Sequence, residues 1–327
     1  MNWHGKRVLV TGAGGFIGSH LAERLAALGA RTRALVRYTS SGNWGWLDRS
    51  LLRGDLEVFL GDIRDRDSVQ RAVKDIDYVF HLAALIGIPY SYYAPDSYVQ
   101  TNIVGTLNVL QAARDNGTER VVHTSTSEVY GTAQYVPIDE QHPLQGQSPY
   151  SASKIGADKL TESFNLSFSL PVVTVRPFNT YGPRQSARAI IPTIITQCLT
   201  DRTVRLGNLS PTRDLNYISD TVNGFLMAAE SEQAVGRTVN LGSGQEISIG
   251  NLAQRIAQLI DKDVTIISDE QRIRPKGSEV ERLLADNRLA SELIGWQPTV
   301  SLDQGLRNTI TWVSENLNTF RPGSYIV

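Results

Sequence analysis

The sequence predicts an α/β fold built on a doubly wound parallel sheet, with a second, smaller lobe. Apolar strand patterns alternate with helical patterns through the first half of the 327-residue chain, and this alternation is typical of a parallel sheet with right-handed crossovers. A glycine-rich turn joins the first strand pattern to the first helix pattern. The second half is less regular and is interrupted by prolines, which favours a lobe made from discontinuous pieces.

The elements of the first half follow in order along the chain. Residues 7–11 are an apolar run that ends at glycines, as expected for a buried strand. Residues 16–28 have apolar side chains at helical spacing, and Gly29 after them is a typical C-cap. Residues 38–55 are interpreted as an ordered loop with a binding role. Further strands are expected at 31–37, 57–60, 78–82, 120–123 and 172–175, and the longest helices at 96–116 and 150–169.

The second half divides between the two lobes. We expect residues 1–176 with about 214–242 to form the sheet domain, and about 177–213 with 243–320 to form the smaller lobe. The smaller lobe would close over the carboxyl ends of the strands, where ligands of such sheets bind. Helix patterns lie at 188–200, 220–230, 251–260 and 302–316, and a strand pattern lies at 238–241.

The composition excludes several classes of function. The formal net charge is −1, so the chain has no broad positive field to attract nucleic acid or an anionic membrane. No apolar stretch reaches the roughly 18 residues of a membrane-spanning helix. Cys198 is the single cysteine, which excludes an intramolecular disulfide and fits a reducing cytoplasm. The five histidines lack metal-ligand spacing, so no metal site is expected.

The glycine-rich turn predicts a dinucleotide site. Gly12, Gly15 and Gly18 stand at three-residue spacing between the first strand and the first helix, with Phe16 and Ile17 beside them. Glycine permits the tight turn and lets the backbone approach a pyrophosphate, and the helix N-terminus adds free N–H groups. A glycine turn without a ligand is the alternative, but the strand–turn–helix position favours binding. The sheet domain is therefore predicted to be a Rossmann-type dinucleotide-binding domain.

The end of the second strand indicates which nicotinamide cofactor binds. An acidic residue there bonds the ribose 2′-hydroxyl of NAD, whereas an arginine accommodates the 2′-phosphate of NADP. This chain has Arg37 and no acid nearby, so NADP is favoured over NAD; a solvated surface arginine is the alternative. Asp62, after the third strand, is placed to contact the adenine, with Ile63 packed beside it.

Tyr150 and Lys154 form a Tyr-x-x-x-Lys pair at the start of a long helical pattern. A free tyrosine has a pKa near 10, which is too high for a base at neutral pH. A lysine four residues later lies on the same helix face. Lys154 is therefore expected to lower the Tyr150 pKa and to bond the nicotinamide ribose. Tyr150 would then deprotonate a sugar hydroxyl as hydride leaves the same carbon.

Thr126, Ser127 and Glu128 follow the fifth strand and so lie at the carboxyl edge of the sheet. Thr126 is suited to hydrogen bond the reacting hydroxyl. Glu128 is suited to remove a proton from carbon next to a ketone, and Ser127 to hold a leaving hydroxyl or relay a proton. The alternative is a capping turn with a solvated glutamate.

These motifs occur together in an order typical of one family. The chain resembles the extended short-chain dehydrogenase/reductase family, in its nucleotide-sugar-modifying branch, over almost its whole length. Besides the glycine turn and the Tyr150–Lys154 pair, the motifs that carry the resemblance are His81 to Ala84, Thr101 to Thr106, Ser125 to Gly131, Arg176 to Arg184, Arg213 to Asp220, Asn240 to Gly242 and Arg274-Pro275.

Within this family the Thr-Ser-Glu set resembles that of sugar-nucleotide 4,6-dehydratases. Residues 85–93 and 185–188 look most like dehydratases of the legionaminic acid pathway, which act on nucleotide-linked N-acetylglucosamine. The resemblance implies C4 oxidation by Tyr150 and the cofactor, removal of the C5 proton by Glu128, loss of water from C6 and return of hydride to C6. The dTDP-glucose dehydratases carry aspartate where Ser127 stands, so Glu128 is expected to protonate the leaving hydroxyl as well.

Other functions stay open. UDP-glucuronate decarboxylases carry the same Thr-Ser-Glu set and would need a cation at the substrate carboxylate. An NDP-sugar 4-epimerase generally lacks the glutamate. A catalytically silent cofactor-sensing protein would have kept the fold and lost the chemistry, which the intact set of Glu128, Tyr150 and Lys154 disfavours.

The resemblance also implies binding roles outside the chemistry. Leu82, Ala83 and Ala84 would line the cofactor, and the loop at Arg37 resembles that of GDP-mannose 4,6-dehydratases, which use NADP. The helices at 96–116 and 150–169 would form a homodimer interface. Asn179, Arg213 and Arg274 would contact the diphosphate or nucleotide, whose base the sequence does not identify.

Overall fold

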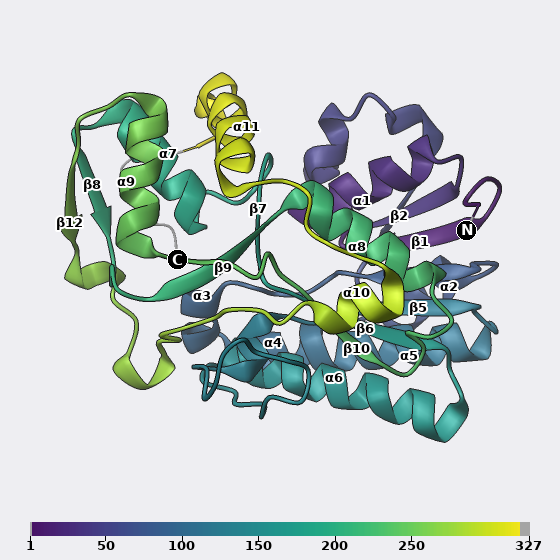
Figure 1. The fold of residues 1–327 in the computed structure, drawn as a ribbon. Coiled ribbons are helices and arrows are strands. Elements are labelled where there is room, and N and C mark those ends of the chain that lie inside the picture. Colours follow the sequence, from purple (N-terminus) through teal and green to yellow (C-terminus); the bar gives the residue numbers. More distant parts are fainter. Residues whose placement is uncertain (1, 321–327) are drawn as a thin grey trace.

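A seven-stranded parallel sheet forms the centre of the larger part of the molecule, as the sequence predicts (Figure 1). The computed structural model describes residues 2–320. The strand order is β10-β6-β5-β4-β1-β2-β3, which reverses direction next to β1, so the sheet is doubly wound. The strands are β1 (Arg7–Thr11), β2 (Arg31–Arg37), β3 (Leu56–Gly61), β4 (Tyr78–His81), β5 (Arg120–Thr124), β6 (Val172–Pro177) and β10 (Thr238–Leu241).

Helices cover both faces of this sheet and enclose a separate core on each. Val8 and Val10 of β1 belong to the core under one set of helices, whereas Leu9 between them belongs to the core on the other face. This alternation follows from the two-residue period of a strand. The first face carries α1 (Phe16–Ala27), α8 (Ile218–Glu230) and α10 (Arg288–Ile294), and the second carries α2 (Arg66–Val73), α5 (Gly105–Asp115) and α6 (Pro149–Phe168).

The single helix expected at 96–116 is wrong in detail, because the segment is divided. It comprises α4 (Pro95–Tyr98), a π-helical turn at Val99–Val104 and α5. Within the turn, the buried Asn102 amide donates to the Leu85 carbonyl and to Ser153 Oγ, and its oxygen accepts from the Leu85 N–H. The wider turn directs this side chain inward, where it fixes the loop after β4. Helix α3 (Ile88–Tyr93) follows that loop.

The smaller lobe contains strands that periodicity in the sequence did not reveal. Three short strands form one sheet and two form another, and helices pack around a third apolar core. Strands of three to six residues are too short to show a pattern of alternation. These elements are β7 (Asn179–Tyr181), β8 (Thr203–Leu206), β9 (Thr212–Tyr217), β11 (Glu246–Ser248), β12 (Thr265–Ser268), α7 (Ile190–Thr200), α9 (Ile249–Ile260) and α11 (Leu302–Glu315).

The remaining ordered pieces are single turns. The segment 38–55, expected as an ordered loop, contains two of them. Among residues 2–320, none of the helices is both long enough and apolar enough to cross a membrane. The 3₁₀ turns lie at Gly45–Arg49, Arg53–Asp55, Ser127–Tyr130, Glu270–Arg272, Lys276–Ser278 and Leu317–Thr319.

Candidate active site

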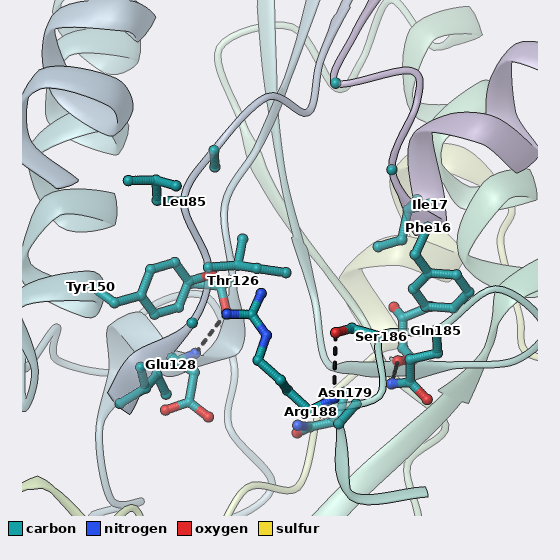
Figure 2. A pocket seen from close by; sticks show the side chains of 18 of the residues that line it. Phe16, Ile17, Leu85, Thr126, Glu128, Tyr150, Asn179, Gln185, Ser186 and Arg188 are labelled. Carbon is teal, nitrogen blue, oxygen red and sulfur yellow. Dashed lines mark hydrogen bonds between the residues drawn. The ribbon is translucent and has the colours of Figure 1, made fainter. Parts of the chain in front are cut away.

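One large cavity, about 880 Å³ in volume, collects every residue that the sequence singled out for binding or chemistry. It runs from the glycine turn, past the carboxyl ends of the strands, to the smaller lobe, and Figure 2 shows side chains from both parts directed into it. The predicted residues that line it are Gly12, Gly15, Phe16, Ile17, Gly18, Arg37, Asp62, Ile63, Leu82, Ala83, Ala84, Thr126, Ser127, Glu128, Tyr150, Lys154, Asn179, Arg213 and Arg274.

The glycine turn has the geometry that a dinucleotide requires. Gly12 has φ of +70°, and a Cβ there would lie 2.9 Å from Ala83 Cα. A Cβ at Gly18 would overlap the Gly12 carbonyl oxygen. Only glycine therefore satisfies both positions, and the bare backbone faces the cavity at the N-terminus of α1. Thr11 Oγ1 accepts hydrogen bonds from the N–H groups of Leu82 and Ala83, each at 3.0 Å, which fixes the neighbouring strand ends.

Two arginines surround Asp62 at the far end of the cavity. Arg64 donates hydrogen bonds from Nε and NH2 to the Asp62 carboxylate, the shorter at 2.7 Å. These bonds hold the pKa of Asp62 below its usual value. Arg37 lies 3.9 Å from the same carboxylate, and its side chain is 70% exposed. Ile63 is buried beside Asp62. The end of β2 thus presents a guanidinium to the cavity, as the sequence predicts.

The segment 38–55, which the sequence predicts as a binding loop, completes this end of the cavity. Asn43 and Gly45 line the cavity, and the Trp46 N–H donates to the Gly14 carbonyl at 3.0 Å. A Cβ at Gly14 would lie 2.6 Å from the Trp44 carbonyl oxygen. The loop therefore rests directly on the glycine turn. The run of small residues in 38–55 indicated a binding loop, but no sequence signal indicated this contact.

Thr126, Ser127 and Glu128 form the turn that follows β5. Thr126 Oγ1 accepts a hydrogen bond from the Glu128 N–H at 3.2 Å, so the capping turn considered as an alternative is present. The cap uses the backbone of Glu128 and leaves its carboxylate free to face the cavity, as Figure 2 shows. Ser127 is 2% exposed. The turn therefore caps the 3₁₀ segment and also positions the Glu128 carboxylate.

Tyr150 and Lys154 begin α6 next to that turn, and both are buried. Burial raises the pKa of Tyr150, and a hydrogen bond with Thr126 opposes the rise. Lys154 Nζ donates to the Thr124 carbonyl at 2.6 Å, and burial lowers its pKa to about 8. The direct lowering of the Tyr150 pKa by Lys154, expected from the sequence, is thus not seen here: burial prevails, and the ammonium binds a strand carbonyl.

The smaller lobe contributes two arginines that share one acid. Glu279 Oε1 lies 3.5 Å from Arg213 NH2 and 3.7 Å from Arg274 NH1. Arg213 is 7% exposed, and burial lowers its pKa, although its guanidinium is still charged at neutral pH. Asn179 Oδ1 is buried without a hydrogen-bond partner within the described residues. The sequence predicted Asn179, Arg213 and Arg274 at this place, and all three line the cavity. It gave no indication of Glu279.

The balance of charge in the cavity differs from that of the whole chain. Among the described residues, three acidic side chains, Asp62, Glu128 and Glu279, line it, against seven basic ones. A cavity that is positive in a chain of net charge −1 suits a ligand with several negative charges. The basic residues are Arg37, Arg64, Lys154, Arg188, Arg213, Arg272 and Arg274.

Comparison with known proteins identifies the family. The family described as "GDP-mannose 4,6 dehydratase" matches residues 9–309. The UDP-N-acetyl-alpha-D-glucosaminuronate decarboxylase of Bacillus cytotoxicus is 34% identical over 321 residues, which cover 95% of this chain and 98% of the relative. The chain therefore belongs to the extended short-chain dehydrogenase/reductase family, among its nucleotide-sugar-modifying members.

Solved structures of similar proteins share the whole fold. The epimerase Mth375 of Methanothermobacter thermautotrophicus has a TM-score of 0.89 and 31% identity, covering 97% of this chain and 94% of its own. DesIV, a dTDP-glucose 4,6-dehydratase of Streptomyces venezuelae solved with NAD bound, has a TM-score of 0.87 and 30% identity, covering 96% and 99%. These relatives catalyse three different reactions at nearly equal similarity, so the site itself has to distinguish among them.

Proposed function

We propose that this protein is a nucleotide-sugar 4,6-dehydratase that acts on an N-acetylglucosamine-type sugar. The observation that carries the proposal is the position of Glu128, which lines the same cavity as Thr126 and Tyr150 and lies beside them (Figure 2). A 4-epimerase only removes and returns hydride at C4, so it has no use for a carboxylate base at this place. A dehydratase requires one. Segments 85–93 and 185–188, which resemble those of dehydratases of the legionaminic acid pathway, support an acetamido sugar as substrate. Both segments contribute to the cavity wall.

The residues at the glycine turn fit a nicotinamide dinucleotide. Gly12, Gly15 and the N-terminus of α1 would hold the pyrophosphate, and Asp62 would lie at the adenosine. Arg37 supports NADP, because an exposed guanidinium suits a 2′-phosphate better than a ribose hydroxyl. When bound, the oxidised nicotinamide supplies the acceptor for the C4 hydride and later the donor to C6.

The chain's own groups would move the protons. Thr126 would orient the C4 hydroxyl and Tyr150 would take its proton. Burial raises the pKa of Tyr150 and opposes this step, so the Thr126 hydrogen bond and the positive charge of a bound nicotinamide would have to lower that pKa. Glu128 removes the C5 proton, which the C4 ketone has made acidic. The C6 hydroxyl leaves with a proton as water, and the double bond forms between C5 and C6. Ser127 is a poor acid, so Glu128 itself returns its proton to the departing hydroxyl. C6 then accepts hydride, and C5 accepts the proton that Tyr150 took from the C4 hydroxyl, relayed through Glu128. This gives the 4-keto-6-deoxy sugar with no net use of cofactor and returns both side chains to their starting state.

The diphosphate would bind between the lobes. Arg213 and Arg274 face the cavity, and the Glu279 carboxylate lies near both guanidinium groups, which supports the binding of an oxyanion at this place. The unpartnered oxygen of Asn179 faces the same cavity and would accept a hydrogen bond from the nucleotide.

A second candidate, decarboxylation of a UDP-uronate, is favoured by one observation. That reaction needs a cation for the substrate carboxylate, and Arg188 places a guanidinium in the cavity, near Gly87. Both reactions begin with oxidation at C4 and differ in the group lost afterwards.

Product mass separates the candidates. The enzyme would be incubated with UDP- and GDP-N-acetylglucosamine and with UDP-glucuronate. Loss of one water from an N-acetylglucosamine nucleotide, with no added reductant consumed, is the expected result. Loss of carbon dioxide from the glucuronate alone would replace the proposal with the decarboxylase. Unchanged mass with inversion at C4 would show an epimerase.

We also propose a homodimer formed through the helices at 96–116 and 150–169. In the structure α5 packs against α6, and Leu166 and Phe168 on α6 are 76% and 50% exposed. Such exposed apolar side chains suit burial against a second copy. Sedimentation equilibrium is expected to give twice the chain mass, and a monomer at micromolar concentration would contradict the proposal.

A further inference from the structure

Arg188 is a cavity residue that forms no ion pair with any other described residue. It lies between β7 and α7, and its guanidinium NH1 would lie 2.9 Å from a Cβ at Gly87. The salt bridges formed within residues 2–320 do not include Arg188, whereas Arg213 and Arg274 both face Glu279. Its backbone N–H is held by Ser186 Oγ at 3.4 Å. The backbone of Arg188 is therefore held in place, while its guanidinium has no hydrogen bond or salt bridge to another described residue.

The position of Arg188 is at the catalytic end of the cavity. Its charge lowers the pKa of Tyr98 against the larger raising effect of burial. The Tyr98 hydroxyl donates to the Gly87 carbonyl at 2.5 Å, and the Tyr98 ring packs edge-on against Tyr150, with 6.3 Å between ring centroids. Figure 2 shows the Arg188 side chain extending from the smaller lobe toward the region of Thr126 and Tyr150. Arg188 and Tyr150 thus both lie close to Tyr98.

We propose that Arg188 determines substrate specificity by donating hydrogen bonds to a carbonyl-type oxygen on the sugar ring. The inference rests on the proposed function in one respect, that the cavity takes a nucleotide sugar. A guanidinium presents several N–H donors and no acceptor. It therefore forms stronger hydrogen bonds with a planar carbonyl or carboxylate oxygen than with a ring hydroxyl. Two sugar substituents supply such an oxygen: the carbonyl of a 2-acetamido group and the carboxylate of a uronic acid. Glucose itself has neither.

Binding measurements test this without turnover. Affinities of UDP, UDP-glucose, UDP-N-acetylglucosamine and UDP-glucuronate, and of the GDP series, would be measured by calorimetry for the wild type and for Arg188→Ala. The wild type is expected to prefer one carbonyl-bearing sugar over glucose by about tenfold or more, and Arg188→Ala to lose that preference while binding the bare diphosphate as before. Arg205→Ala is the matched control, because Arg205 is exposed in the same lobe and does not line the cavity.

A second variant moves the guanidinium without removing it. Gly87 has φ of −72°, which alanine adopts freely, and the added methyl group would displace the end of the Arg188 side chain. Gly87→Ala is expected to lose part of the same preference. Equal weakening of the bare diphosphate in Arg188→Ala would place Arg188 at the phosphates and overturn the inference, as would a preference that survives the substitution.

The outcomes distinguish this inference from the proposed function. An Arg188-dependent preference for the N-acetyl sugar supports both. An Arg188-dependent preference for the glucuronate supports the role of Arg188 and identifies its acceptor as a carboxylate. It would contradict the proposal that the protein dehydrates an N-acetylglucosamine nucleotide. Dehydration of the N-acetyl sugar at unchanged affinity and rate by Arg188→Ala would support the proposed function and overturn the role of Arg188.

Discussion

Asp158 lies one helical turn after Lys154 on α6, and its charge supports the buried ammonium of that lysine. Burial lowers the pKa of Lys154 to about 8, and the charge of Asp158 opposes this. The same carboxylate accepts a hydrogen bond from Ser125 Oγ at 2.7 Å and faces Arg176 at 3.0 Å. Ser125 directly precedes Thr126. Asp158 therefore ties the helix of Tyr150 and Lys154 to the strand end that positions Thr126.

Replacing Asp158 by asparagine is expected to destabilise the fold in a pH-dependent manner. Burial raises the pKa of Asp158, but the His123 hydrogen bond and the Arg176 charge outweigh it and hold the pKa at about 2, below its ordinary value of 3.8. The carboxylate thus stabilises the folded state fully above pH 3.8, and the contribution is lost as the pH falls toward 2. At neutral pH, Asp158→Asn removes the carboxylate that pairs with the buried Arg176, at a cost of roughly 3–5 kcal/mol.

Urea unfolding at several pH values measures this effect. The difference in unfolding free energy between the wild type and Asp158→Asn should be constant near neutral pH and should shrink below about pH 4. Asp263→Asn, at an exposed position, is the control. A difference that stays the same down to low pH would show that the cost comes from packing and not from the charge.

The sequence predicted the large sheet well because its signals are local. Strands β1 and β6 contain compact apolar runs, and the three-residue spacing of the glycines marks the turn after β1. Tyr150 and Glu128 were placed in one site because parallel strands and the helices after them converge at one sheet edge. Periodicity did not reveal the sheets of the smaller lobe. Their strands are short and pair with strands distant in sequence, as Glu246 does with Asp214.

The parts of the site that sequence reasoning missed depend on tertiary contacts. Glu279 becomes relevant only because the fold brings it between Arg213 and Arg274. The neighbours of Glu279 in the sequence do not signal this role. Charge and polarity in the sequence indicate which residues can act, and the fold decides which of them meet.

Arg37 is expected to discriminate between the two nicotinamide cofactors. Its guanidinium is 70% exposed and faces the cavity near Asp62, where a 2′-phosphate would gain charge-assisted hydrogen bonds. Arg37→Ala should weaken NADP binding by about tenfold or more and leave NAD binding nearly unchanged, as measured by fluorescence titration. Arg31→Ala, at the exposed start of the same strand and away from the cavity, is the control. Equal affinities in Arg37→Ala and wild type would identify Arg37 as a solvated surface residue.

Arg274 is expected to bind the diphosphate of the substrate. One of its guanidinium nitrogens, NH1, is buried with no hydrogen-bond partner in the described part of the chain, although it lies 3.7 Å from Glu279. A phosphate oxygen would satisfy that donor, so Arg274→Ala should raise the Kd for UDP or GDP by about tenfold. Arg282→Ala is the comparison, because Arg282 pairs with Glu246 and does not line the cavity. Unchanged nucleotide affinity would remove Arg274 from the binding site.

Glu128→Gln tests the assigned base most directly. Glutamine keeps the size of the side chain, and the Thr126 cap is unaffected because it uses the backbone N–H of residue 128. Binding of cofactor and sugar nucleotide should persist, while turnover should fall by roughly 10²- to 10⁴-fold. In the proposed reaction Tyr150 and not Glu128 serves the oxidation at C4, so the absorbance of reduced cofactor should appear on mixing and should decay slowly. Glu292→Gln, at an exposed position, should behave as wild type. Normal turnover in Glu128→Gln would show that another group removes the C5 proton, and absence of any reduced cofactor would place Glu128 in the C4 step instead.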